Sequence, residues 1–518
     1  FNQDGWEDLF IGGGKKGKLG VYRNEQGLRF VRQRAKAFEA ELPRDQTSII
    51  AWRPDMKDMA LLLGQSAYES FQTELPVFNH FSMVTGKMET ITNSEGSSTG
   101  PMTMADWDGD GDLDLFVGGR VQSGRFPESP KSLLYRNHNG KFVPALESSQ
   151  PFKNVGMVSA AIFSDLTGDP LPDLMLACDW GPLYLFENQG GQFVEVNKDI
   201  HWSDSLTSKI SFNSLNKLRG WWTSLTAMDA NQDGRLDLVA GNWGRNHERG
   251  DSSFQPLRIY YGVASGPGGY PSVESHWDQE RAAFVPSRDW GTLSASLPWL
   301  NRAFKTFQTF AHASIDEALQ TIPGEFQFLE ARCFESIVFL NLDSAWKAIP
   351  LPDEAQITPL FGIGIGDFNN DGMEDLVGSQ NFFGVNALDS RQDAGTGLLL
   401  FGNGDGTFTA SLPASSGIAI PGEGRGLAVA DFDHDGRADF IATQHSGPTK
   451  LYRNLEQKVG LAVRLRGPAG NLQAIGAKGR LIYENGTKGP TREWRLGDGY
   501  WSQTPNRQVF GFDASPAA

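Results

Sequence analysis

Cysteine and histidine are scarce in this chain. Only two cysteines, Cys178 and Cys333, occur among 518 residues; two are too few for a disulfide framework, and they lie too far apart in sequence for a zinc-binding spacing. We therefore expect both to be small, buried hydrophobic side chains. The eight histidines are scattered, and neither H-E-x-x-H nor G-x-S-x-G occurs, so the sequence carries neither a zinc-metalloprotease nor a serine-hydrolase signature.

Long apolar runs and positive charge are also lacking. No stretch approaches the roughly 18 consecutive apolar residues of a membrane-spanning helix. The formal net charge is −16, whereas a protein that binds nucleic acid needs a basic face for the phosphates. We therefore expect no membrane span and no nucleic-acid partner. What the chain does have is 60 glycines, 34 phenylalanines and 14 tryptophans, a composition typical of many short strands and tight turns in an all-β protein.

One acidic pattern recurs along the chain: Asp-x-Asp/Asn-x-Asp-Gly-x-x-Asp, followed by an apolar run. Clear copies begin at Asp106, Asp229, Asp367 and Asp431, a weaker copy begins at Asp165, and the chain opens at Asn2 with a copy that lacks its first Asp. A second pattern, such as YRNHNGKF from Tyr135, follows each acidic copy by roughly 20–30 residues and is typical of a β-hairpin. Each repeat unit is therefore about four short strands long.

Such a unit cannot bury its own sheet and must stack on its neighbours. The number of units favours a seven-bladed β-propeller over residues 1–456, with eight blades as the alternative. The unit around Ala51 keeps its apolar strand (MALLLGQ) but has lost the acidic spacing. A small separate β domain is predicted for residues 459–518, opening with a half-exposed strand from Leu461 to Leu465.

The gap between the copies at Asp229 and Asp367 is too long for one blade, and it predicts a helical insertion at about residues 288–322. Apolar residues step there by three or four, at Leu293, Leu297, Leu300, Phe304, Phe307, Ala311 and Ile315. Pro298 suits a first helical position, and Ser314 with Glu317 forms a capping box for a second short helix.

The acidic pattern has a direct chemical interpretation. Side chains at alternate positions of a tight loop converge on one point, glycine permits the bend, and hard oxygen ligands at this density suit Ca²⁺. The spacing and the flanking strands differ from those of an EF-hand. The alternative is a set of Asx-turns without metal. Position seven would contribute its backbone carbonyl. The candidate ligands are, loop by loop, Asn2, Asp4, Trp6 and Asp8; Asp106, Asp108, Asp110, Asp112 and Asp114; Asp165, Thr167, Asp169, Leu171 and Asp173; Asp229, Asn231, Asp233, Arg235 and Asp237; Asp367, Asn369, Asp371, Met373 and Asp375; and Asp431, Asp433, Asp435, Arg437 and Asp439.

These loops predict about five or six calcium ions, by the ligand chemistry of this cation. The loop from Asp165 to Asp173 should be the weakest, because Thr167 replaces a carboxylate or amide and Pro170 stands where the bend needs glycine.

The acidic loops resemble the FG-GAP/VCBS repeats, the calcium-loop blades of integrin α-subunit propellers. The segments NLQAIGAKGRLIYENG, REWRLGDGYWSQ and RQVFGF look like the ASPIC/UnbV domain that follows such repeats in cartilage-acidic-protein-like proteins. The resemblance implies a seven-bladed propeller that is secreted or bound to the cell surface, with calcium in its loops and a binding or adhesion role. Because the first loop lacks its leading Asp and the tail stops early, we expect a fragment of a longer protein.

Three functions remain open at this stage. The preferred hypothesis is a non-enzymatic binding module for an extracellular protein or glycan, and no catalytic residue is predicted. Aromatic turns at Trp180, Trp243 and Phe382-Phe383 would then present binding platforms, although packing between blades is the alternative. The other hypotheses are a polysaccharide lyase or hydrolase built on a calcium-stabilised propeller, and a purely structural spacer.

Overall fold

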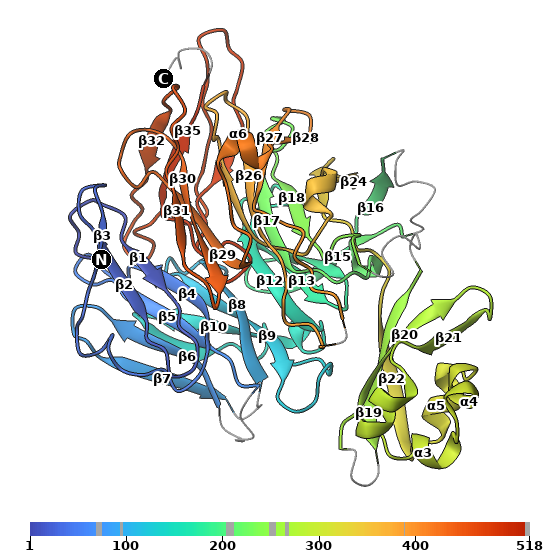
Figure 1. Ribbon diagram of the computed structural model, residues 1–518. Helices are drawn as coiled ribbons and strands as arrows, with labels where there is room; N and C mark the ends of the chain where they lie inside the picture. The colour runs from blue at the N-terminus through green and yellow to red at the C-terminus, as the bar shows by residue number, and fades with distance from the viewer. Residues whose placement is uncertain are drawn as a thin grey trace.

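The computed structural model describes residues 1–68, 75–93, 97–203, 212–247, 255–264, 269–387 and 389–512. Seven consecutive antiparallel sheets make up most of it (Figure 1). The first three consist of β1 (Leu9–Ile11), β2 (Gly20–Asn24) and β3 (Phe30–Arg32); β4 (Gln46–Trp52), β5 (Ala60–Gln65), β6 (Leu75–Ser82) and β7 (Met88–Asn93); and β8 (Ser97–Ala105), β9 (Asp114–Gln122), β10 (Leu133–His138) and β11 (Lys141–Pro144).

The remaining four sheets follow the same plan. They consist of β12 (Met157–Ser164), β13 (Asp173–Asp179), β14 (Leu183–Asn188) and β15 (Phe193–Val196); β17 (Ser224–Met228), β18 (Asp237–Gly241), β23 (Ile337–Asn341) and β24 (Ala345–Pro350), with β16 (Asp199–Trp202) added parallel to β24; β25 (Leu360–Gly366), β26 (Asp375–Gln380), β27 (Leu398–Gly402) and β28 (Phe408–Ala410); and β29 (Glu423–Ala430), β30 (Asp439–His445) and β31 (Lys450–Tyr452). Three-residue 3₁₀ helices (Gln150–Phe152, Leu215–Lys217 and Asp353–Ala355) and the short helix α6 (Pro413–Ser416) lie in connections.

The first strands of successive sheets lie side by side, with β4 next to β8, β8 next to β12, β12 next to β17, β17 next to β25 and β25 next to β29. The last sheet then meets the first: Phe432 packs with Leu9 and Phe30, and the Trp6 ring stacks on His434 with their centroids 3.9 Å apart. The sheets therefore surround a common axis, and the fold is a seven-bladed β-propeller. The blade number predicted from the repeats is confirmed, including the second blade that has no acidic loop.

The insertion is larger than the predicted helical segment. It is a four-stranded sheet of β19 (Leu257–Ala264), β20 (Ser272–Asp278), β21 (Ala283–Pro286) and β22 (Gly324–Ala331), joined by α2 (Trp290–Ser296), α3 (Leu300–Ala303), α4 (Phe307–Ala311) and α5 (Ile315–Gln320). It enters the fifth blade between β18 and β23 and projects away from the propeller (Figure 1). The sequence pattern missed this sheet because its strands carry no acidic loop.

Within the insertion, the predicted capping box of Ser314 and Glu317 is confirmed. Pro298 precedes α3 in a turn instead of opening a helix, which corrects the prediction. Phe307 and Ala311 were also misplaced on the buried face, because four short helices replace one continuous helix and the register restarts at each. The other predicted positions, from Leu293 to Ile315, do pack into the core of the insertion.

The tail forms two small sheets, which pair β32 (Leu461–Arg464) with β35 (Arg507–Phe510) and β33 (Lys478–Gly479) with β34 (Arg492–Glu493). It has a small core of its own, formed by Leu481, Trp494 and Phe510, and it is also hydrogen-bonded to the propeller. The backbone N–H of Met104 donates to the Leu496 carbonyl over 2.9 Å, and that of Ala161 donates to Gly499 over 3.1 Å. Since Met104 and Ala161 lie on the first strands of different blades, the segment 496–503 occupies the central axis.

Two features show how closely this segment is held. Gly499 has a φ of +82°, and a Cβ there would lie 1.7 Å from the Leu225 carbonyl oxygen of β17, so only glycine fits. On the other side of the axis, Ser502 Oγ accepts the Leu427 N–H of β29 over 2.9 Å, and Gln503 exchanges two hydrogen bonds with the Ala51 backbone of β4. The tail therefore joins blades that do not touch one another.

Candidate calcium loops and central cavity

Five acidic loops connect the first and second strands of their blades, whereas the loop from Asn2 to Asp8 precedes β1, and in the four clear copies the glycine is a structural requirement. In four loops the first Asp accepts the backbone N–H of the glycine five residues later, over 2.8 to 3.2 Å. These glycines, Gly111, Gly234, Gly372 and Gly436, have φ values between +81° and +97°, which side chains with a Cβ disfavour. The repeated Asp-Gly of the sequence therefore fixes the bend.

The last Asp of each clear loop is buried at the start of the second strand. Asp237, for example, accepts the Ala230 N–H on one oxygen and the Asn341 N–H on the other. Burial raises the pKa of Asp114, Asp237 and Asp375 to about 8, and the negative charges of neighbouring loop carboxylates add to the rise. A cation placed beside these acids would offset the cost of burying their charge and favour the ionised form.

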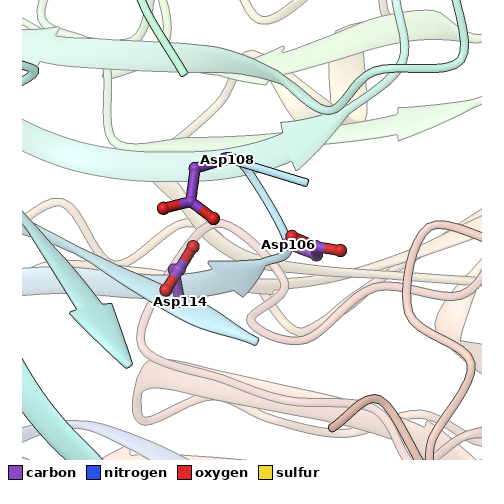
Figure 2. A group of neighbouring side chains, drawn as sticks. All are labelled: Asp106, Asp108 and Asp114. Carbon is purple, nitrogen blue, oxygen red and sulfur yellow. The ribbon is translucent and has the colours of Figure 1, made fainter. Parts of the chain in front are cut away.

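Two loops bring three carboxylates together. In the loop from Asp106 to Asp114, oxygens of Asp106, Asp108 and Asp114 lie within 4.8 Å of one another (Figure 2), and the loop from Asp431 to Asp439 places Asp431, Asp433 and Asp439 in the same arrangement. Asp108 Oδ1 and Asp114 Oδ2 are buried and accept no hydrogen bond from the residues described. Two carboxylate oxygens that point at each other without a donor between them suit a shared cation.

The predicted ligands at positions five and seven are placed differently. Asp110 and Asp435 stand outside the two triads, and one oxygen of each accepts the backbone N–H of position seven, that of Asp112 over 2.9 Å and that of Arg437 over 3.0 Å. The same contact recurs in the other loops, where Trp6, Leu171, Arg235 and Met373 donate to Asp4, Asp169, Asp233 and Asp371. Asx-turns therefore coexist with the carboxylate triads.

The remaining loops gather no such triad among the described residues. In two of them an amide replaces the third-position carboxylate: Asn231 and Asn369 each donate to the Asp two residues later, Asp233 and Asp371, over 3.1 and 2.9 Å. In the first loop, Asn2 and Asp4 are exposed, and the amino group of Phe1 contacts Asp8.

The loop from Asp165 to Asp173 has a protein cation instead. Lys478 of the tail places its Nζ 2.7 Å from Asp165 Oδ2 and 3.1 Å from the Asp165 carbonyl oxygen. Asp173 Oδ2 is occupied by three donors, the backbone N–H groups of Leu166 and Thr167 and the Thr167 hydroxyl. Sequence reasoning did not find this lysine, because it lies 313 positions away from Asp165.

Arginines from the second sequence pattern approach the clear loops. Arg136 Nε lies 2.9 Å from Asp108 Oδ2, and Arg453 contacts Asp433 in the equivalent place. The loop from Asp431 to Asp439 has further cations, because Arg507 lies 3.4 Å from Asp431 Oδ2 and Arg437 lies 2.9 Å from Asp435 Oδ2. The YRN repeat, read from the sequence only as a hairpin, is therefore also part of the electrostatics of the loop.

The asparagine of the same repeat joins neighbouring blades. The side-chain amide donates to the carbonyl of the second loop residue of the blade before it: Asn188 to Trp107 over 2.8 Å, and Asn341 to Leu166 over 2.9 Å. Asn24 makes the corresponding bond to Phe432, which connects the first blade to the last over 2.8 Å. In the sequence, this contact between blades is indicated only by the recurrence of the asparagine, because its partner lies in another repeat.

A cavity of about 1870 Å³ lies along the axis of the propeller. Its wall includes residues from sheets around the ring, such as Leu9, Asp179 and Phe361, and from the tail, such as Tyr500. Seven aromatic rings follow one another along this wall with centroid separations of 3.9 to 6.4 Å, and we call them the aromatic arc. In spatial order they are Trp180, Trp221, Trp243, Phe382, Phe361, Tyr500 and Trp501.

The prediction that the aromatic turns at Trp180, Trp243 and Phe382 present exposed binding platforms is corrected in part. Trp180 and Trp243 are 4% and 8% exposed, because they pack against Ile259 and Ala331 at the base of the insertion. Phe382 is partly exposed, as is Trp221, which stacks on Trp243. Both cysteines are buried, as predicted.

Comparisons with known proteins agree with the repeats. A model of the FG-GAP-like repeat matches residues 165–240 and 367–442. A segment of 59 residues is 42% identical to human cartilage acidic protein 1 and 41% identical to the mouse protein, which is 11% of this chain and 9% of either relative. The chain thus contains FG-GAP-like repeats and has a short region similar to cartilage acidic protein 1.

Among solved structures, the V. cholerae biofilm matrix protein Bap1 aligns over 98% of this chain and 94% of its own, with 12% identity and a TM-score of 0.36. A Bombyx mori GH32 β-fructofuranosidase aligns over 66% of this chain and 70% of its own, with 7% identity and a TM-score of 0.25. None of the helices in the described ranges has the length and apolar character needed to cross a bilayer.

Proposed function

We propose that this protein is an extracellular, calcium-stabilised propeller of the FG-GAP type that acts as a binding or adhesion module. The observation that carries the calcium assignment is the pair of carboxylate triads in the loops beginning at Asp106 and Asp431. Calcium bound there would neutralise the buried acids and lock the connection between the first two strands of the blade. The tail, by its sequence, would be an ASPIC/UnbV-like domain.

The residues fit calcium better than other common metals. The donors are carboxylate and carbonyl oxygens, which hard cations prefer, and neither a cysteine nor a histidine belongs to either triad. Asp108, Asp114 and Asp106 would hold the ion in the third blade. We propose that the loops at Asp229 and Asp367 bind more weakly, since an amide replaces one carboxylate, and that the loop at Asp165 binds none, since Lys478 supplies its positive charge.

The location follows from the expected affinity. Loops of this kind in extracellular modules bind calcium at about 10⁻⁴–10⁻³ M, which only the extracellular concentration fills. The short similarity to cartilage acidic protein 1 and the FG-GAP-like repeats support the same assignment.

Binding is favoured over catalysis by how the acids of the cavity are held. Asp179 pairs with Arg120 over 2.7 Å, and Asp389 contacts Arg288, so these two carboxylates already have strong cationic partners. A charge-assisted hydrogen bond of this kind fixes the position of the carboxylate and occupies one of its oxygens. The polysaccharide-acting enzyme and the structural spacer therefore remain the less supported alternatives.

Equilibrium dialysis against calcium, together with thermal melting, tests the proposal. We expect at least two equivalents of calcium per chain and a lower melting temperature in EDTA, because a site at 100-fold excess over its dissociation constant adds about 2.7 kcal/mol of stability. Magnesium at the same concentration should replace calcium poorly, since it demands a tighter octahedral shell. Fewer than two equivalents, or identical melts with calcium and with EDTA, would contradict the calcium assignment.

A further inference from the structure

The central cavity is large for a small-molecule site. Pockets for single drug-sized ligands measure about 300–1000 Å³, and this cavity measures about 1870 Å³. A ligand that fills it must therefore be longer than one sugar ring or one amino acid. The aromatic arc extends along the wall instead of forming a closed cage, which also suits an extended ligand.

The exposed members of the arc offer flat apolar faces to such a ligand. Trp221 and Trp501 are partly exposed, and one face of each stacks on Trp243 and Tyr500, with centroids 3.9 and 5.1 Å apart, while Trp180 lies at a tilt to Trp221 at 4.9 Å. This support fixes the plane of both indoles before a ligand arrives. A pyranose ring carries a flat face of C–H groups that packs on a rigid indole at little entropic cost.

Two polar atoms in the same wall lack partners. Asp179 is 8% exposed; its Oδ2 accepts from Arg120 over 2.7 Å, whereas its Oδ1 is buried and accepts no hydrogen bond within the described part of the chain. Trp501 Nε1 is likewise buried without an acceptor there. A buried polar atom left unpaired destabilises the fold, so such atoms frequently mark a ligand position. One needs a donor and the other an acceptor, and a hydroxyl group can serve as either.

The charge around the arc argues against an anionic ligand. The guanidinium of Arg425 lies over Phe361, 4.2 Å from the ring centroid, but it also contacts the carboxylate of Glu423. Arg120 is paired in the same way with Asp179. These two positive charges are therefore compensated within the protein, which disfavours a carboxylate or sulfate of the ligand beside them.

Resting on the binding role proposed above, we propose that the central cavity is the binding site of an uncharged oligosaccharide. Sugar rings stack on Trp221 and Trp501, a sugar hydroxyl donates to Asp179 Oδ1, and another accepts from Trp501 Nε1. Calcium in the peripheral loops holds the blades that form the wall and does not contact the sugar.

Binding of defined hexasaccharides tests this site. The probes are cellohexaose, chitohexaose and maltohexaose, with hexagalacturonate as the anionic comparison, followed by tryptophan fluorescence and calorimetry in millimolar calcium. We expect at least one neutral hexasaccharide to bind at one per chain. Asp179→Asn and Trp501→Phe should each weaken it about tenfold, the loss typical of one hydrogen bond in a buried site.

Phe307→Ala serves as the matched control, because this aromatic side chain is 64% exposed on α4 of the insertion and does not line the cavity. The affinity of Phe307→Ala for the hexasaccharide should equal that of the parent. Trp501→Phe retains a stacked ring and removes only the N–H, so it remains informative if Asp179→Asn fails to fold.

Several results would overturn the inference. One is binding of hexagalacturonate alone, and another is binding of none of the four sugars. Unchanged affinity in both folded variants would also contradict it. So would binding of a protein partner that the variants lose, if no sugar binds the parent. Calcium stoichiometry is measured on the same samples. A normal calcium content without sugar binding would disprove the oligosaccharide site and leave the calcium proposal standing.

Discussion

At the residue scale, the sixfold acidic pattern separates into positions that converge and positions that stay apart. Asp108 has a buried, unpartnered oxygen facing Asp114, whereas Asp169 is exposed and its Oδ1 accepts the Leu171 N–H over 3.0 Å. We therefore expect Asp108→Asn to remove one equivalent of bound calcium and Asp169→Asn to remove none. Equilibrium dialysis of both variants beside the parent measures the difference.

A second readout separates loss of metal from loss of packing. In EDTA, Asp108→Asn should melt within a degree or two of the parent, because the lost ion pair with Arg136 is offset by the relief of the repulsion that raises the pKa of Asp114. If Asp108→Asn keeps the full calcium content, the triad is not the binding site.

At the scale of elements, the tail supplies a positive charge to one acidic loop. Lys478 contacts Asp165 and is about a third exposed, so the ion pair contributes about 1 kcal/mol or less. We expect Lys478→Met to lower the free energy of unfolding by that amount equally in calcium and in EDTA, and to leave the calcium stoichiometry unchanged. Urea denaturation under both conditions measures it.

Arg29→Met provides the control, because its partner Glu25 is also a surface carboxylate but belongs to a hairpin turn outside the acidic loops. The change in the free energy of unfolding of Arg29→Met should also be the same in calcium and in EDTA. A gain of one calcium equivalent in Lys478→Met would mean that the lysine merely blocks a competent site, contrary to our assignment of the loop at Asp165.

At the scale of the whole molecule, the ring depends on one repeated contact. The Asn24 amide donates to the Phe432 carbonyl across the junction of the first and last blades, and the Asn188 amide donates to Trp107 between the third and fourth blades, each over 2.8 Å. The Oδ1 atoms of both asparagines also accept a glycine N–H of their own hairpin over 2.8 Å. Asn24→Ala and Asn188→Ala should therefore lower the free energy of unfolding by similar amounts, about 1–3 kcal/mol each, since a buried carbonyl loses its donor. Chemical denaturation gives both values.

Asn403→Ala is the matched control, because this asparagine lies exposed in the hairpin of the sixth blade, where Gly402 occupies the joining position. Its effect should stay below about 0.5 kcal/mol. A loss in Asn188→Ala without a comparable loss in Asn24→Ala would show that the first and last blades separate in solution.

The sequence by itself determined the features that depend on neighbours along the chain. The Asp-Gly bends, the apolar second strands and the Asn-containing hairpins recur because each is set by local backbone conformation and by the two-residue period of strands. These are enough to predict seven or eight blades, to locate the acidic loops and to see that Thr167 and Pro170 make one loop depart from the pattern.

Only the tertiary structure decided which charges meet. Lys478 reaches Asp165, Asn24 reaches Phe432 and the segment 496–503 enters the axis, although these partners are separated by hundreds of residues. The same holds for the aromatic arc, whose rings come from three blades, the loop before β17 and the tail. No periodicity encodes such pairs, because closing the ring brings together residues whose spacing in sequence is arbitrary. Each polar group that becomes buried there then needs a hydrogen-bond donor, a cation or a packed ring beside it.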